Sequence, residues 1–191
     1  MSERRAYATA LVALAVGGIG LVVAYGLTWA TAQVPLLAGA DGVGRQAEIA
    51  GRELVPAGAA GGWLALAAVA GVLATRGVGR RVVAVVALLA GIAGAGGAVL
   101  FAARSTAMVT SVDPGAISVA TTPAWLLAVA SGALAIAAAG WTFARGTTWP
   151  VLSARYERRP ERRDVSAWQA QDLGQDPTEE SDGSDRPGLV E

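Results

Sequence analysis

Four long stretches without a charged residue dominate the pattern of hydrophobic and polar positions along the chain. They cover residues 6–29, 57–75, 82–103 and 124–144. A helix rises 1.5 Å per residue, so about 18 or more apolar residues cross the ~30 Å hydrocarbon core of a bilayer. The sequence after Arg145 is too polar to add a fifth span. The pattern therefore predicts an all-α membrane protein, a four-pass transmembrane helical bundle.

The first stretch must be distinguished from a cleaved signal peptide. Arg4 and Arg5 precede it, and Ala30-Thr31-Ala32 resembles a cleavage site made of small residues. Its 24 uncharged residues exceed the ~7–15 apolar residues of a usual signal peptide. We therefore expect a retained membrane span.

The distribution of arginine predicts the orientation, because basic residues are enriched in cytoplasmic segments. Of the 15 basic residues, 12 fall in segments on the side of the N-terminus, and the other side holds only Arg45, Arg52 and Arg104. Both termini are therefore expected in the cytoplasm. Trp29 and Trp125 fall at the outer ends of spans, where an interfacial tryptophan belt is expected.

Small residues four positions apart recur in the spans and predict close helix packing, because helices in lipid associate where their backbones can approach. Examples are Ala13/Gly17, Gly20/Ala24, Gly58/Gly62, Gly91/Ala95 and Ala128/Gly132. A tight bundle, a homo-oligomer interface, or chance in a chain rich in Ala and Gly would each produce this spacing. Residues 76–81 predict a short turn between two antiparallel helices.

The two outer segments contain turn signals. In residues 30–55, Asp41-Gly42 favours a small β-hairpin, and the alternative is a short helix over 45–54 with Glu48 and Arg52 paired. We favour the hairpin because Gly51 would interrupt that helix. Residues 104–122 contain a Pro114-Gly115 turn between Val, Ile and Ser residues. This segment is expected to add strands to the same extracytoplasmic cap.

The candidate outer site comprises Arg52, Glu53 and Pro56, which stand where the outer segment meets the second span. Proline suits the first turn of a helix, and an acidic residue near the helix N-terminus complements its dipole. Helix capping and membrane anchoring are therefore the main interpretation. Ligand recognition by the adjacent opposite charges is the alternative.

The composition changes after residue 146, so we predict a transmembrane domain over residues 1–146 and a largely disordered cytoplasmic tail over 147–191. The basic start of the tail would contact anionic lipid head groups, anchor the fourth span, or bind a protein partner. The candidate residues for these contacts are Trp149, Pro150, Arg155, Tyr156, Arg158, Arg159 and Trp168.

The residue types exclude most catalytic chemistry. The chain has no Cys and no His, and all of its basic residues are arginine. Thiol nucleophiles, imidazole bases, lysine Schiff bases and the usual zinc sites are therefore absent, and we expect no cofactor, no metal and no enzyme activity. The spans also lack the ionisable residues that ion-coupled transport normally uses. Glu157, Glu161 and Asp164 partly neutralise the short arginine patch, which argues against nucleic-acid binding.

Three stretches resemble the tryptophan-associated transmembrane protein family. They are "GRELVPAGAAGGWLALAAVAGVLATRGVGRR" (51–81), "GTTWPVLSARYERR" (146–159) and "AWQAQDLGQDPTEE" (167–180). In the third stretch, Gln171-Asp172-Leu173 departs from the Leu-Asp order of the family. The resemblance implies a four-pass protein of the bacterial plasma membrane whose gene lies near tryptophan biosynthesis genes. It implies no active-site residues.

Together these observations predict a non-enzymatic integral membrane protein associated with tryptophan biosynthesis, acting as an interaction or regulatory subunit. The alternative is binding or transport of tryptophan or a related small metabolite. Expected partners are the lipid bilayer with its anionic head groups and a second copy or another membrane protein.

Overall fold

Four long helices form the transmembrane part of the computed structural model, which describes residues 3–35 and 44–146. They are α1 (Glu3–Gly26), α3 (Pro56–Ala74), α4 (Val78–Val112) and α5 (Trp125–Arg145). Each is long and apolar enough to cross a membrane. The prediction of four candidate spans is therefore confirmed. A single-turn helix, α2 (Gly51–Leu54), directly precedes α3.

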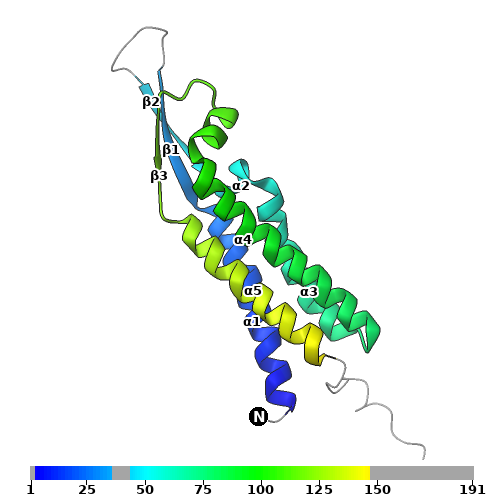
Figure 1. Ribbon diagram of the computed structural model, residues 1–191. Coiled ribbons are helices and arrows are strands. Elements are labelled where there is room, and N and C mark those ends of the chain that lie inside the picture. Colours follow the sequence, from blue (N-terminus) through cyan, green and yellow to red (C-terminus); the bar gives the residue numbers. More distant parts are fainter. Residues whose placement is uncertain (1–2, 36–43, 147–191) are drawn as a thin grey trace, which may run out of the picture. The chain divides into compact units, whose positions relative to one another are not determined.

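The helices form a ring in which each packs against two neighbours. The packed pairs are α1 with α3, α3 with α4, α4 with α5 and α5 with α1. As Figure 1 shows, α1 begins and α5 ends at one end of the bundle, beside the turn from α3 to α4. This turn is tighter than the predicted 76–81 segment, because α4 already begins at Val78. Gly77 makes the tight turn with a φ of 52°, a conformation that glycine adopts without steric cost.

A three-stranded antiparallel sheet lies at the other end of the bundle (Figure 1). Its strands are β1 (Thr28–Pro35), β2 (Gly44–Ala50) and β3 (Ser118–Thr121), in the order β2-β1-β3. Ala32 pairs with Ala47 on one side and with Val119 on the other. Strands β1 and β2 thus occupy the place of the expected hairpin, and the alternative helix over 45–54 forms only its last turn, as α2. The Asp41-Gly42 turn lies outside the described residues.

Two helix ends differ clearly from the predicted ends of the spans. Helix α1 ends at Gly26 rather than at Trp29, because the chain turns at Leu27 and pairs as strand β1 from Thr28. Helix α4 continues past the predicted end at residue 103 to Val112. Arg104 interrupts it with a φ of −135° and a ψ of 28°. The helix resumes because Met108 and Val109 pack against the core beyond this kink.

Glycines bring the helix backbones into direct contact. A methyl group added at Gly17 of α1 would lie 2.9 Å from the backbone nitrogen of Ala135 in α5. At Gly132 of α5 it would lie 2.8 Å from the nitrogen of Ala95 in α4, and at Gly61 of α3 2.6 Å from the oxygen of Ala90. The predicted tight bundle is therefore confirmed, and these glycines pack within one chain.

An aromatic cluster joins the sheet to the bundle. The ring centroid of Trp29 lies 4.7 Å from that of Tyr25 and 5.1 Å from that of Phe101. All three side chains are buried. The Tyr25 hydroxyl donates to the carbonyl oxygen of Gly94 at 2.7 Å, and the Trp29 Nε1–H donates to that of Ala24 at 2.8 Å. The expectation that Trp29 belongs to an interfacial belt is wrong, because the strand turns its indole into this cluster.

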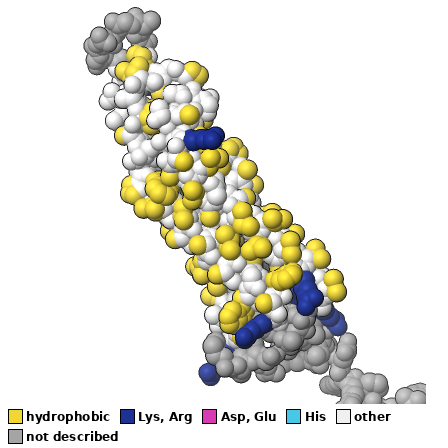
Figure 2. Space-filling view, in the orientation of Figure 1, with side chains coloured by type: hydrophobic (Ala, Val, Ile, Leu, Met, Phe, Trp, Pro, Cys, Tyr) yellow, Lys and Arg dark blue, Asp and Glu magenta, His cyan; other side chains and the backbone are white. Residues whose placement is uncertain are grey.

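The outer faces of the helices carry large apolar side chains. Examples on each helix are Val12, Leu64, Leu89 and Leu126, all more than a third exposed. In Figure 2 hydrophobic side chains cover the visible helical surface, and basic side chains gather at the end away from the sheet, with another basic patch nearer to it. This distribution suits a bundle surrounded by lipid.

The glycine contacts predict a position-specific cost of a single methyl group. In Gly17→Ala the added carbon would push the α1 backbone away from α5, and we expect a loss of about 1–3 kcal/mol in the free energy of unfolding. Gly96 is the matched control, because an added methyl there meets no atom within 4 Å. Gly96→Ala should leave stability unchanged or raise it slightly. Reversible unfolding in mixed detergent micelles measures both; equal effects would contradict the backbone contact.

Candidate functional site

The predicted outer residues occupy the junction between β2 and α3. Arg52 and Glu53 lie in α2 with exposed side chains, and Pro56 is the first residue of α3. The residue that caps α3 is Val55, and no side chain makes a capping hydrogen bond there. Glu53 lies in α2, three residues before α3 begins at Pro56, so it does not cap α3. The two charges project from a backbone turn whose other residues are buried.

The buried residues of this turn hold the sheet against the aromatic cluster. A methyl group added at Gly51 would overlap the Trp29 indole, and one at Gly58 would overlap the Tyr25 hydroxyl. Leu54 packs in the same core. The Gly51 N–H donates to the carbonyl oxygen of Leu27 at 3.1 Å. The spacing of Gly51 and Gly58 thus serves the packing of two aromatic side chains from α1 and β1.

Other polar contacts near the sheet are sparse. Arg45 of β2 forms an ion pair with Asp113 at 3.4 Å, and the Thr28 hydroxyl donates to Glu48 at 3.4 Å. Within residues 3–35 and 44–146, no group of three or more acidic residues is placed to hold a metal ion. The described residues at the sheet end therefore offer exposed charges, such as Arg52 and Glu53, for contact with a ligand or head group.

The predicted tail residues lie outside the described part of the chain. They are Trp149, Pro150, Arg155, Tyr156, Arg158, Arg159 and Trp168. Their roles remain predictions.

A buried arginine joins three elements at the end opposite the sheet. Arg80, in the first turn of α4, is only 2% exposed. Its guanidinium donates to the carbonyl oxygen of Gly146, just after α5, at 2.8 Å. It also lies 5.4 Å from the ring centroid of Tyr7 in α1. The sequence suggested Arg80 only as part of a basic turn, because the helix start at Val78 that directs it inward was not predicted.

The residue that follows Arg80 in α4 is an exposed arginine. Arg81 follows Arg80 in α4, is exposed, and lies 6.0 Å from the ring centroid of Phe143 in α5. The pair shows that one turn of α4 carries one arginine into the bundle and presents the next to its surroundings. Arg80 connects α4 to α1 and to the end of α5, whereas Arg81 is one of the exposed arginines at this end of the bundle.

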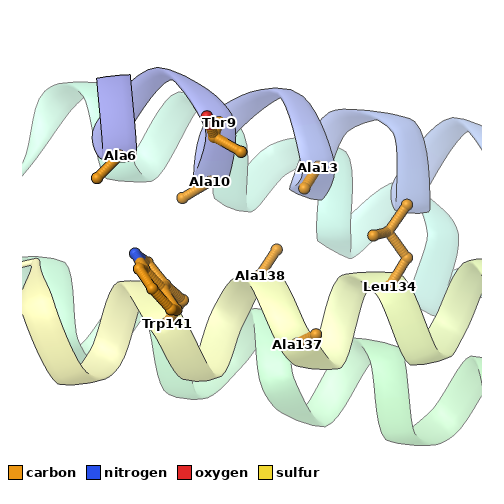
Figure 3. Close-up of a pocket in the computed structure, with 8 residues that line it drawn as sticks. All are labelled: Ala6, Thr9, Ala10, Ala13, Leu134, Ala137, Ala138 and Trp141. Atoms are coloured by element: carbon orange, nitrogen blue, oxygen red, sulfur yellow. The ribbon is translucent and has the colours of Figure 1, made fainter. Parts of the chain in front are cut away.

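A narrow apolar groove runs along the seam between α1 and α5 near the same end (Figure 3). Its volume is about 230 Å³. Helix α1 contributes Ala6, Thr9, Ala10 and Ala13, and helix α5 contributes Leu134, Ala137, Ala138 and Trp141. In Figure 3 the Trp141 indole projects from α5 toward the alanines of α1. Sequence reasoning did not find this groove, because its alanines match those that face lipid.

A wider groove lies between α3 and α4. Its volume is about 640 Å³, and its walls include Ala57, Gly61, Trp63 and Leu89. Trp63 is 66% exposed. Both grooves include exposed side chains, Trp63 in one and Trp141 in the other, so they lie on the side of the bundle.

The buried tie predicts that Arg80→Gln loosens the end of α5. The shorter amide loses the contact with Tyr7 and weakens the hydrogen bond to Gly146, and we expect a loss of about 1–3 kcal/mol in the free energy of unfolding. Amide hydrogen exchange over the last turn of α5 should become faster. Arg81→Gln, at the next residue, should change the free energy of unfolding by no more than ~0.5 kcal/mol. It should leave amide exchange over the last turn of α5 unchanged. Unchanged exchange in Arg80→Gln would contradict the tie.

The comparisons with known proteins give one match. We found no curated protein and no solved structure that is similar to this chain. The sequence pattern of the tryptophan-associated transmembrane protein family matches residues 11–178, which include α3 to α5 and most of α1. Together with the four apolar helices, the match identifies a multi-pass transmembrane protein. The chain therefore belongs to the tryptophan-associated transmembrane protein family.

Proposed function

We propose that this protein is a non-enzymatic interaction or regulatory subunit of the bacterial plasma membrane that serves tryptophan biosynthesis. The observation that carries the proposal is the closure of the bundle by contacts between helix backbones. Gly17, Gly61 and Gly132 place three of the four helix seams at van der Waals distance. A solute path along the bundle axis would require these helices to separate.

The polar groups inside the bundle support the same proposal. The Tyr25 hydroxyl is bonded to Gly94 and the Thr142 hydroxyl to the carbonyl oxygen of Ala138 at 2.8 Å. The buried cation Arg80 is bonded at the end of the bundle. Ion-coupled transporters instead use ionisable residues near the middle of the membrane. Function is therefore expected at the surfaces and ends of the protein.

The placement of arginine supports a cytoplasmic location for both termini. In the described residues, Arg5, Arg76, Arg80, Arg81 and Arg145 are found at the end where α1 begins and α5 ends (Figure 1). Arg45, Arg52 and Arg104 belong to the half with the sheet. Under the positive-inside rule the first end faces the cytoplasm. Residues 147–191 then follow α5 on the side where the biosynthetic enzymes act.

The tail sequence provides the features of a partner site. "WPVLSARYERR" combines aromatic residues with arginines, residue types that contribute most to binding energy at protein interfaces. We propose that this segment and residues 168–178 bind a cytoplasmic or membrane partner. Arg155, Arg158 and Arg159 would also contact anionic head groups.

Truncation after Gly146 tests the interaction directly. Crosslinking and purification from native membranes, grown with and without tryptophan, should give a partner that the full-length chain retains and the truncated chain loses. Replacing Trp149 and Tyr156 with Ala in the full-length chain should also reduce recovery, whereas changing Glu179 and Glu180 to Gln should not. Equal unfolding midpoints of all variants would establish that the bundle is intact. A truncated chain that retains every partner would refute the proposal.

Transport of tryptophan is the alternative, and the indole-lined groove at Trp141 is the observation that favours it. Vesicles containing the purified protein should accumulate labelled tryptophan no faster than empty vesicles if the closed bundle has no solute path. Uptake above that background would replace the interaction proposal. Uptake that disappears in Trp141→Ala would assign it to the groove.

A further inference from the structure

We propose that the groove between α1 and α5 is a phospholipid site, which holds one acyl chain of an anionic lipid and places its phosphate beside Arg145. This site is separate from the tail segment and does not depend on the proposed partner. The chemistry of the groove, its length along α1 and the charges at its end support the site.

The groove is suited to hydrocarbon. Alanines form most of its walls, and Leu134 and Trp141 add larger apolar surfaces. Its polar groups are the Trp141 indole N–H and the Thr9 hydroxyl, which already donates to the carbonyl oxygen of Arg5 at 2.8 Å. A polar metabolite would lose hydrogen bonds to water here and recover almost none. An acyl chain has no hydrogen bonds to lose when it enters.

The length of the groove matches part of one leaflet. Along α1 it extends from Ala6 to Ala13, eight residues, whose seven rises cover about 10 Å of helix. Half of the hydrocarbon core is about 15 Å thick. The groove therefore lies within the leaflet at the end where α1 begins, and a chain lying in it would have its head group at that surface.

A cation stands at the head-group end of the groove. The Arg145 guanidinium lies 4.6 Å from the ring centroid of Trp141, and Trp141 forms part of the groove wall. Arg5 directly precedes Ala6, which lines the groove on α1. Among the residues whose side chains the structure describes, this end carries five arginines and no acidic residue. This charge balance favours a lipid with a negatively charged head group.

The groove between α3 and α4 lacks this combination. It is nearly three times as large, more open, and begins at Ala57 in the half of the bundle that carries the sheet. Its tryptophan, Trp63, has no cation among the described residues stacked on it in the way that Arg145 stacks on Trp141. We therefore expect lipids to exchange there without selection by head group.

Quenching of tryptophan fluorescence by brominated lipids tests the site in the full-length protein. Vesicles of phosphatidylcholine are prepared with increasing amounts of phosphatidylglycerol or phosphatidylcholine that carries bromine on its acyl chains. Brominated phosphatidylglycerol should quench more strongly and reach saturation at a lower fraction of the lipid. Ala137→Phe, which fills the groove from an exposed position of α5, should abolish this difference. Ala133→Phe, exposed on the same helix and outside the groove, should preserve it.

The charge contribution is tested by a second matched pair. Arg145→Gln should lower the preference for phosphatidylglycerol about fivefold, the factor that corresponds to ~1 kcal/mol per cation at an anionic surface. Arg81→Gln removes an equal charge from the same end and should leave the preference unchanged. Unfolding midpoints verify that each variant is folded.

Three results would overturn the site. Equal quenching by the two brominated lipids would exclude selection by the head group. If Arg145→Gln and Arg81→Gln lowered the preference for phosphatidylglycerol equally, the lipid would be attracted by all the arginines of this end and not by one site. A crosslinked dimer in the wild type that Ala137→Phe disrupts and Ala133→Phe retains would assign the groove to a second copy of the chain.

Discussion

The close packing of Tyr25, Trp29 and Phe101 is the constraint on which the rest of the structure depends. Aromatic pairs at these tilted geometries gain energy beyond the area that they bury, and the two polar atoms of the cluster are hydrogen-bonded to helix carbonyls. Glycine at positions 51 and 58 leaves room for the rings. The cluster thereby connects α1 to α4, directs β1 away from the bundle, and fixes the point at which β2 returns toward α3.

The transmembrane helices were predictable because each lies in a long run without charge, and that property depends on sequence alone. Their ends were harder to predict. A charged residue ended the expected third span at 103, yet α4 continues because Met108 and Val109 find a core to pack against. Trp29 appeared as an interfacial residue because its partners, Phe101 and Gly51, are distant in sequence. The location of Arg52 and Glu53 followed from the sequence, whereas the packing role of the glycines beside them did not.

The interior and the exterior of this bundle have different roles. Inside, methyl-sized spaces are absent at the glycine seams, and the buried arginine ties α4 to the end of α5. Outside, two lateral grooves differ in width and in the charge at their ends. Alanine is found both at the helix contacts and in the groove. Its small side chain packs against a neighbouring backbone, and it leaves a recess where the next helix is farther away. For this reason the pattern of small residues predicted tight packing and could not reveal the groove.

The charged residue at the kink of α4, Arg104, also limits the thickness of the membrane that the bundle fits. The exposed Arg104 at the kink and Arg81 near the start of the helix are 23 residues apart, about 34 Å at the helical rise. Neither guanidinium is stable in hydrocarbon, so the apolar core between them must fit a bilayer of similar depth. In a thinner membrane the bundle would have to tilt, at a cost for each ångström of mismatch. The spacing of these two arginines on α4 therefore favours one depth of the four-helix bundle in the lipid.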